Sequence, residues 1–264
     1  MKKVFILAGV LVLAAALPVF ARPSSDNVLK VGATPVPHAE LLNLVKSDLA
    51  AQGITLQVVE FTDYVTPNLS LDAGDLDANF FQHVPYLESF AAERNLKLVS
   101  AFGVHVEPLG LYSRTSKSAG ELRDGASIAI PDDPTNRGRA LLLLQANGLI
   151  TLQASAGIEG TPADIASNPR NFRFRELEAA QLPRALGDVD AAVINGNYAL
   201  DAGLNPVTDS LILEGAQSPY VNIVAVKAGH ENDPRILALS AALRSQKVKD
   251  YILATYNGGV VPVF

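Results

Sequence analysis

Cysteine is absent from all 264 residues, and so is tryptophan. Without cysteine the chain has no disulfide, no thiolate metal ligand, no cysteine nucleophile and no sulfur for lipid attachment. Positive charge is also in the minority, since 21 Lys and Arg stand against 27 Asp and Glu. This balance excludes a nucleic-acid binder that depends on a basic surface. Hydrophobic residues make up 48% of the chain, which is enough for a sizeable folded core.

The most continuous apolar run lies at the start of the chain, in residues 1–21. Two lysines precede it, Pro18 interrupts it, and small residues near its end suit a signal peptidase. The run is shorter than the roughly 20 apolar residues that a membrane-spanning helix needs. We therefore predict a signal peptide at 1–21, cleaved before Arg22, followed by a flexible lead-in at 22–27. An uncleaved N-terminal anchor is the alternative.

Strand and helix patterns alternate over the rest of the chain. Residues 126–131, for example, have the apolar character of an inner strand, and 136–147 follow with helical periodicity and a terminating Gly148. Such alternation is typical of α/β proteins, in which mostly parallel sheets are covered by helices on both faces. The sequence predicts two lobes of this kind, each a mostly parallel sheet flanked by helices.

Two extended stretches that contain proline and glycine, 104–114 and 214–222, bracket the second unit. We interpret them as two crossings between the lobes. The first lobe then holds residues 28–114 plus 219–264, and the second lobe holds 115–218. A double crossing makes a hinge, and a cleft between hinged lobes is a preferred place for a ligand.

Few residues support catalysis. The four histidines have no spacing typical of metal ligands, and no nucleophile elbow, P-loop or dinucleotide fingerprint is present. We therefore predict no metal site, no cofactor and no enzymatic activity. His83, close in sequence to Asp75 and Asp77, is the one basis for an alternative in which the chain is an amino-acid or peptide hydrolase.

The pattern of residues 130–139 (IPDDPTNRGR) predicts the end of a strand followed by the start of a helix. Asp133 can cap the helix with Pro134 at its first position, and the free N–H groups of a helix start suit a carboxylate. Arg139 lies within the first two turns, where its planar guanidinium could bind a ligand carboxylate through two hydrogen bonds. A surface ion pair with Asp132 or Asp133 is an equally good interpretation from the local sequence.

Aromatic residues are 6% of the chain, yet the segment 75–86 contains Phe80, Phe81, His83 and Tyr86. With Tyr64 upstream, they could line an apolar pocket with a polar rim. Alternation along a strand places the two phenylalanines on opposite faces, so one of them is expected in the core. Two asparagines at strand ends, Asn195 and Asn222, can donate and accept hydrogen bonds toward a ligand, although asparagine also favours turns.

Several of these segments carry a family resemblance. They are VGATPVPHAE at 31–40, DYVTPN at 63–68, GDLDANFFQHVPY at 74–86, PDDPTNRGR at 131–139, LEAAQLPR at 177–184, AVIN at 192–195, SPYVN at 218–222 and NGG at 257–259. In this order, the chain resembles the NlpA family of methionine-binding substrate-binding proteins of bacterial ABC importers. The resemblance spans essentially everything after the predicted signal peptide.

The resemblance implies a two-lobed periplasmic binding protein of the type II, two-crossover kind, with an amino acid, typically methionine, held between the lobes. Its partners would be an inner-membrane ABC permease and the ATPase of that permease, and the protein itself would be a monomer. Arg139, aided by Asn136, would bind the ligand carboxylate, while Asn195 and Asn222 would hold the amino and carboxylate groups. The side-chain pocket would be lined by Tyr64, Phe81, His83 and Tyr86, and His38 would make no direct contact.

One departure from the resemblance concerns location. Most members of the family carry a lipidated cysteine directly after the signal, and this sequence has none. We therefore predict a protein exported to the periplasm that is not a lipoprotein, either free or held by an uncleaved signal. The same scaffold could instead bind another apolar amino acid or a methionine-containing dipeptide.

Overall fold

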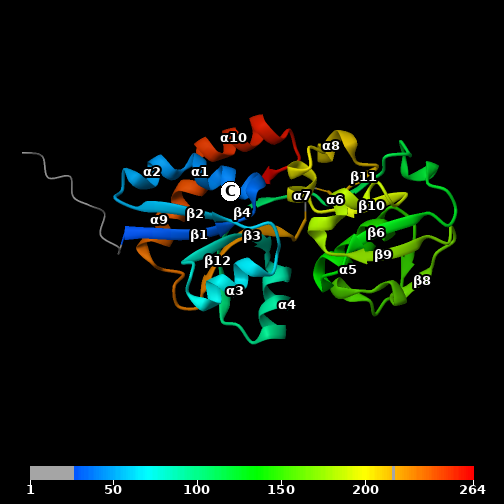
Figure 1. Cartoon of the computed structure of the whole chain (residues 1–264), viewed down its shortest axis with the longest axis horizontal. Helices are drawn as coiled ribbons and strands as arrows, with labels where there is room; N and C mark the ends of the chain where they lie inside the picture. Colours follow the sequence, from blue (N-terminus) through cyan, green and yellow to red (C-terminus); the bar gives the residue numbers. More distant parts are fainter. Residues whose placement is uncertain (1–26, 216–217) are drawn as a thin grey trace, which may run out of the picture.

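The computed structural model describes residues 27–215 and 218–264. They form two large β-sheets that are each covered by helices, and the two units lie side by side along the long axis of the molecule (Figure 1). None of the helices in these ranges has the length and hydropathy needed to cross a membrane. The predicted signal peptide at 1–21 lies outside the described residues.

The first sheet has six strands in the order β13-β4-β12-β3-β1-β2. Strand β1 pairs in parallel with β2 and β3, whereas β12 runs antiparallel to both β3 and β4. The strands are β1 (Val28–Ala33), β2 (Thr55–Glu60), β3 (Ala78–His83), β4 (Leu98–Val106), β12 (Val221–Lys227) and β13 (Val261–Pro262). The chain thus leaves this sheet after β4 and returns to its centre with β12.

The second sheet has five strands in the order β11-β5-β10-β6-β9, and a separate two-stranded sheet joins β7 to β8. Strand β6 is parallel to β9 and β10, and β5 is antiparallel to β10 and β11. The strands are β5 (Gly110–Tyr112), β6 (Ser127–Pro131), β7 (Thr151–Leu152), β8 (Ile165–Ser167), β9 (Arg173–Leu177), β10 (Ala191–Ile194) and β11 (Ile212–Leu213).

The α/β class predicted from the sequence is confirmed, but two details of the prediction are wrong. The sheets are mixed rather than mostly parallel, because an apolar pattern marks a buried strand without giving its direction. Strand β5, which the sequence placed in the first lobe within 28–114, pairs in the second sheet. The first crossing therefore falls between β4 and β5, at residues 107–109.

Helices cover both faces of the two sheets. In the first unit, apolar residues of α1, α2, α9 and α10 form one core with β1, whereas α3 and α4 pack on the opposite face. In the second unit, α5 covers one face, and α6 and α7 cover the other. The helices are α1 (Glu40–Leu44), α2 (Lys46–Ala50), α3 (Thr66–Ala73), α4 (Val84–Arg94), α5 (Pro134–Ala146), α6 (Leu182–Ala185), α7 (Gly196–Asp201), α8 (Pro206–Asp209), α9 (Pro234–Leu243) and α10 (Gln246–Tyr256).

Strand β12 shows how the alternating pattern builds this arrangement. Val224 and Val226 are fully buried in the core on one face of the sheet, and Ile223 and Ala225 are buried in the core on the other face. Both faces of a central strand must be apolar when helices cover both. Asn222 is the exception at the start of the strand, where it reaches the space between the two units.

Candidate functional site

A small cavity lies between the two sheets. The eight residues predicted from the sequence as ligand-binding all line it, namely Tyr64, Phe81, His83, Tyr86, Asn136, Arg139, Asn195 and Asn222. The sequence analysis missed four further lining residues, Gln82, Glu107, Gly196 and Asn197.

Strand β3 supplies the first wall of the cavity. Phe80 is fully buried in the main core, whereas Phe81 on the other face of the strand lines the cavity. The strand ends at His83, which caps α4: Nδ1 of the ring accepts a hydrogen bond from the backbone N–H of Tyr86 at 3.1 Å. Because Nδ1 is an acceptor, the proton of the neutral ring is on Nε2, which points across the cavity.

Helix α5 supplies the facing wall from the second unit. Asp133 caps the helix and accepts from the backbone N–H of Asn136 at 2.9 Å, as the sequence predicted. The side-chain oxygen of Asn136 then accepts from Nε2 of His83 at 3.1 Å and from Nδ2 of Asn195 at 2.8 Å. Asn136 therefore joins the two units across the cavity and fixes the rotamers of two other lining residues.

Arg139 is buried, with 4% of its surface exposed. Nε and Nη2 of Arg139 donate to the two carboxylate oxygens of Glu214, the first at 3.0 Å. Nη2 also donates to the backbone oxygen of Glu107 at 2.9 Å. The guanidinium carbon lies 4.3 Å from the centre of the Tyr220 ring. The alternative of a surface pair with Asp132 or Asp133 is thus wrong. Nη1 bonds to none of the described residues, so two N–H donors of this cavity-lining guanidinium have no partner among them.

Aromatic rings form the apolar part of the wall. The ring of Tyr64 lies 5.7 Å from Phe81 and 5.8 Å from Tyr86, and the hydroxyl of Tyr86 donates to the backbone oxygen of Tyr64 at 2.8 Å. The hydroxyl of Tyr64 donates to Asn197 Oδ1 in the second unit. The polar ends of these rings are therefore satisfied, and their apolar edges are available to an aliphatic or thioether side chain.

Burial keeps the histidines around the cavity neutral. Desolvation is the main cause that lowers the pKa of His83 to about 3, and the nearby charge of Arg139 lowers it further. Desolvation likewise lowers the pKa of His38 to about 4 and that of His105 to about 3. Near neutral pH the histidines therefore act as hydrogen-bonding groups and add no charge to the site.

A neutral, buried His83 predicts a specific pH dependence of stability. The ordinary pKa of 6.5 applies in the unfolded chain, so unfolding at pH 5 takes up a proton that native His83 does not bind. Stability should fall below pH 6.5, and His83 alone should account for about 2 kcal/mol at pH 5. The free energies of unfolding of the wild type and of His83→Gln are measured in urea. Their difference should change by this amount between pH 7.5 and pH 5, because only the wild type loses stability through this histidine. A difference independent of pH would mean that the pKa of His83 is the same in the native and the unfolded chain.

The structure removes the basis of the hydrolase alternative. His83 ends strand β3, whereas Asp77 directly precedes the strand. Asp77 accepts from the backbone N–H of Lys30 at 2.7 Å and pairs with Arg235 at 3.3 Å. Within residues 27–215 and 218–264, His83 bonds to the Asn136 side chain and the Tyr86 backbone and to no carboxylate that could raise its basicity as a catalytic base.

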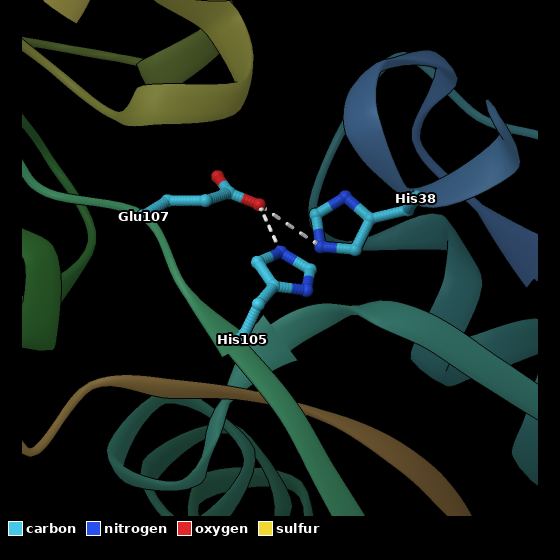
Figure 2. Close-up of side chains that lie close together, drawn as sticks. All are labelled: His38, His105 and Glu107. Carbon is cyan, nitrogen blue, oxygen red and sulfur yellow. Dashed lines mark hydrogen bonds and ion pairs between the residues drawn. The ribbon is translucent and has the colours of Figure 1, made fainter. Parts of the chain in front are cut away.

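Beside the cavity, His38, His105 and Glu107 bring their side chains together (Figure 2). One ligand atom of each lies within 4.8 Å of the others, and all three residues are buried. The sequence analysis saw no metal spacing among the histidines, because His38, in the helical segment Pro35–Ala39, and His105, in β4, meet only in the folded structure. The shortest contacts in the group, 2.7 Å and 3.2 Å, are hydrogen-bond distances to one carboxylate oxygen.

The sequence analysis did not predict Glu107 as a cavity residue, because it lies in an extended stretch that was interpreted as a crossing between the lobes. A glutamate before proline in an extended stretch carries no local signal for a binding site. Gly196 was missed for a related reason: it lies against Glu107 only across the two units. A Cβ at Gly196 would come within 2.7 Å of the Cβ of Glu107, so a larger side chain at this position would displace the glutamate.

Two α/β units joined by two crossings, with a buried cavity between them, have the fold of two-lobed periplasmic binding proteins. This fold defines the class: a protein that encloses a small ligand between its lobes. The chain belongs to the NlpA lipoprotein family, whose model matches residues 29–264.

Individual relatives agree with this class. The chain is 46% identical over 236 residues to the membrane lipoprotein TpN32 of Treponema pallidum, covering 89% of this chain and 88% of the relative. It also resembles the structure of a nutrient-binding protein from Burkholderia cenocepacia bound to methionine, with 47% identity, a TM-score of 0.87 and coverage of 89% and 100%. A periplasmic substrate-binding protein of an ABC transporter from Coxiella burnetii matches with 44% identity, a TM-score of 0.85 and the same coverage.

These relatives correct the predicted location. The absence of cysteine led to the prediction of a periplasmic protein that is not a lipoprotein. The matching family is described as a lipoprotein family, and the T. pallidum relative is named a membrane lipoprotein, so this prediction is wrong for the family to which the chain belongs. The prediction rested on the absence of a single residue type, cysteine, and residues 1–26 lie outside the described part of the structure.

Proposed function

We propose that this protein is the substrate-binding component of a bacterial ABC importer, binds one methionine in the cavity between its lobes, and catalyses no reaction. One observation carries the proposal: a buried guanidinium and amide side chains from both units line the same cavity, together with aromatic rings. Arg139 and Asn195 come from the second unit, and Asn222 and Phe81 come from the first. Such a set fits the carboxylate, the ammonium and the apolar side chain of one amino acid.

The two lobes would be residues 28–107 with 218–264, and residues 108–215, joined at the crossings. Glu214 ties these crossings together, because its backbone N–H donates to the oxygen of Leu109 at 2.8 Å and its carboxylate accepts from the N–H of Leu109 at 3.3 Å. The same carboxylate holds Arg139. A ligand bound to Arg139 would therefore favour one arrangement of the hinge, and the permease and its ATPase would respond to that closed form.

The experiment that tests this function is calorimetry on residues 22–264, unfolded and refolded to remove carried-over ligand. L-methionine, D-methionine, other apolar amino acids and Gly-Met are titrated in turn. We expect tight one-to-one binding of methionine. If only another ligand of the panel gives binding heat, the protein is still a substrate-binding protein but its substrate is not methionine. If none of the ligands gives binding heat, the proposed function is contradicted.

A further inference from the structure

The segment NGG at 257–259, one of those that carry the family resemblance, lies outside the ligand cavity. Among the described residues that line the cavity, none belongs to this segment. It forms the turn between α10 and β13, in which Asn257 and Gly258 have φ angles of 47° and 91°. The N–H of Gly259 closes the turn by donating to the backbone oxygen of Tyr256 at 2.8 Å. The role of this turn must therefore be sought in what it touches.

The turn touches the second unit. A Cβ at Gly259 would lie 3.1 Å from Cδ and 3.2 Å from Cγ of Pro206, and a Cβ at Gly258 would lie 3.3 Å from Cγ2 of Val207. Gly259 is buried, and Pro206 is the one buried residue of α8. Figure 1 shows the red segment that follows α10 beside the yellow segment that contains α8. The two units thus meet through a glycine and a proline ring, and we name this pair the hinge contact.

Both sides of the hinge contact are held in place. Tyr256, directly before the turn, is buried, and its hydroxyl donates to Glu40 of α1. On the other side, the side-chain oxygen of Asn205 caps α8 by accepting from the N–H of Val207 at 2.9 Å. The ring of Pro206 is closed on its own backbone and cannot swing away. A group inserted between the two sides would therefore move one unit relative to the other, because packed interiors transmit strain.

The hinge contact adjoins both crossings. Strand β13 follows the turn and pairs Val261 with Val106, the last residue of β4 before the first crossing. Strand β11 follows α8, pairs with β5 directly after that crossing, and leads to Glu214 at the second crossing. Two crossings that lie side by side still allow the units to twist about the chain that joins them. A tight contact beside the crossings restricts this twist.

The ligand cavity depends on how the two units are aligned. His83 of β3 and Asn136 of α5 bond across it at 3.1 Å, while Asn222 and Asn195 line it from opposite units. Hydrogen bonds weaken as their distances and angles leave the preferred range. A ligand held by both walls has the same requirement. A tilt that starts at the hinge contact therefore weakens ligand binding without a change in any lining residue.

We propose that the hinge contact of Gly259 with Pro206 fixes the angle between the two lobes and thereby sets the ligand affinity of the cavity. Gly259 is a positioning residue: it acts through the arrangement of the units and does not touch the ligand. Glycine is required because a Cβ would be a spacer between the lobes. The effect on methionine rests on the proposed function, whereas the angle between the lobes is measured independently of any ligand.

The first test is a double-mutant cycle on methionine binding, measured by calorimetry on protein refolded free of ligand. The backbone of Gly259 is outside the left-handed region, so alanine can adopt it. We expect Gly259→Ala to weaken methionine binding by about tenfold and Pro206→Ala to change it by less than about threefold. The double variant should recover most of the loss. The binding stoichiometry gives the folded fraction of each variant, so the affinity is not confused with misfolding.

The cycle isolates the contact between the units. A Cβ at residue 259 would also lie 3.1 Å from the backbone oxygen of Tyr256, but this approach is internal to the first unit. Pro206→Ala cannot relieve it. The part of the affinity that the double variant recovers therefore belongs to the hinge contact alone.

The second test measures the arrangement of the lobes by the distance between two spin labels. Because the chain has no cysteine, labels attach only at Asp72→Cys in the first unit and Ser118→Cys in the second, both at exposed positions. We expect Gly259→Ala to shift the label distance and Pro206→Ala, added to it, to return the distance to that of the wild type. Gly187→Ala is the control, since its Cβ would meet no atom closer than 3.8 Å, and it should leave distance and affinity unchanged.

The outcomes separate this inference from the proposed function. Wild-type affinity in Gly259→Ala, or a loss that Pro206→Ala does not recover, would overturn the inference and leave the proposed function standing. Label distances that stay unchanged in Gly259→Ala, with and without methionine, would also overturn it, because any loss of affinity would then arise within the turn. A wild type that binds no amino acid would contradict the proposed function, and the label distances of the ligand-free proteins would then decide whether the hinge contact fixes the angle.

Discussion

Replacing Arg139 by alanine is expected to weaken methionine binding by about 2–5 kcal/mol. The guanidinium is buried and pairs with Glu214, so its removal would leave the ligand carboxylate near a second carboxylate without a cation. Arg139→Lys keeps the charge but loses the planar two-nitrogen contact with Glu214, and we expect an intermediate loss. The dissociation constants are measured by calorimetry on ligand-free protein.

Arg137 provides the matched control for this experiment. It lies on the same helix and pairs with Glu176 at 3.1 Å, on the side of α5 that does not line the cavity. Arg137→Ala should therefore leave methionine affinity within about twofold, as expected for a partly exposed pair. Methioninamide, which lacks the carboxylate, should bind to the wild type and to Arg139→Ala with similar affinity. An unchanged methionine affinity in Arg139→Ala would remove this residue from the site.

Replacing Gly138 by alanine is expected to destabilise the second unit by about 3 kcal/mol. A Cβ at this position would lie 2.1 Å from the backbone oxygen of Ile158 and 2.6 Å from its carbonyl carbon. Alanine favours a helix over glycine by about 1 kcal/mol, but this gain cannot offset a clash with backbone atoms that have no alternative rotamer. The close approach of α5 to the turn at Gly157–Glu159 requires glycine here.

The free energy of unfolding in urea, followed by circular dichroism without ligand, measures this effect. Gly187→Ala is the control, because its Cβ would meet no atom closer than 3.8 Å and its backbone is outside the left-handed region. We expect that variant to stay within about 0.5 kcal/mol of the wild type. If Gly138→Ala is as stable as the control, α5 and the turn must be able to separate without cost.

Much of the fold could be predicted from local sequence. The strand at β6, the cap at Asp133 and the start of α5 follow from the order of apolar residues, aspartate and proline, because capping acts within three residues. The opposite faces of Phe80 and Phe81 follow from the geometry of a strand. The motif residues at 63–68, 74–86, 131–139, 192–195 and 218–222 also identified eight residues that line one cavity.

The sequence by itself therefore determined the class of the fold, the family and most residues of the cavity wall, since each depends on neighbours along the chain. Tertiary structure decided which groups face one another. Arg139 pairs with Glu214, 75 positions away, and His38 bonds Asn222, 184 positions away, because β12 returns to the centre of the first sheet after the second unit is complete. The direction of each strand and the place of Glu107 between two histidines depend on the same return, and no local pattern of apolar and polar residues encodes it.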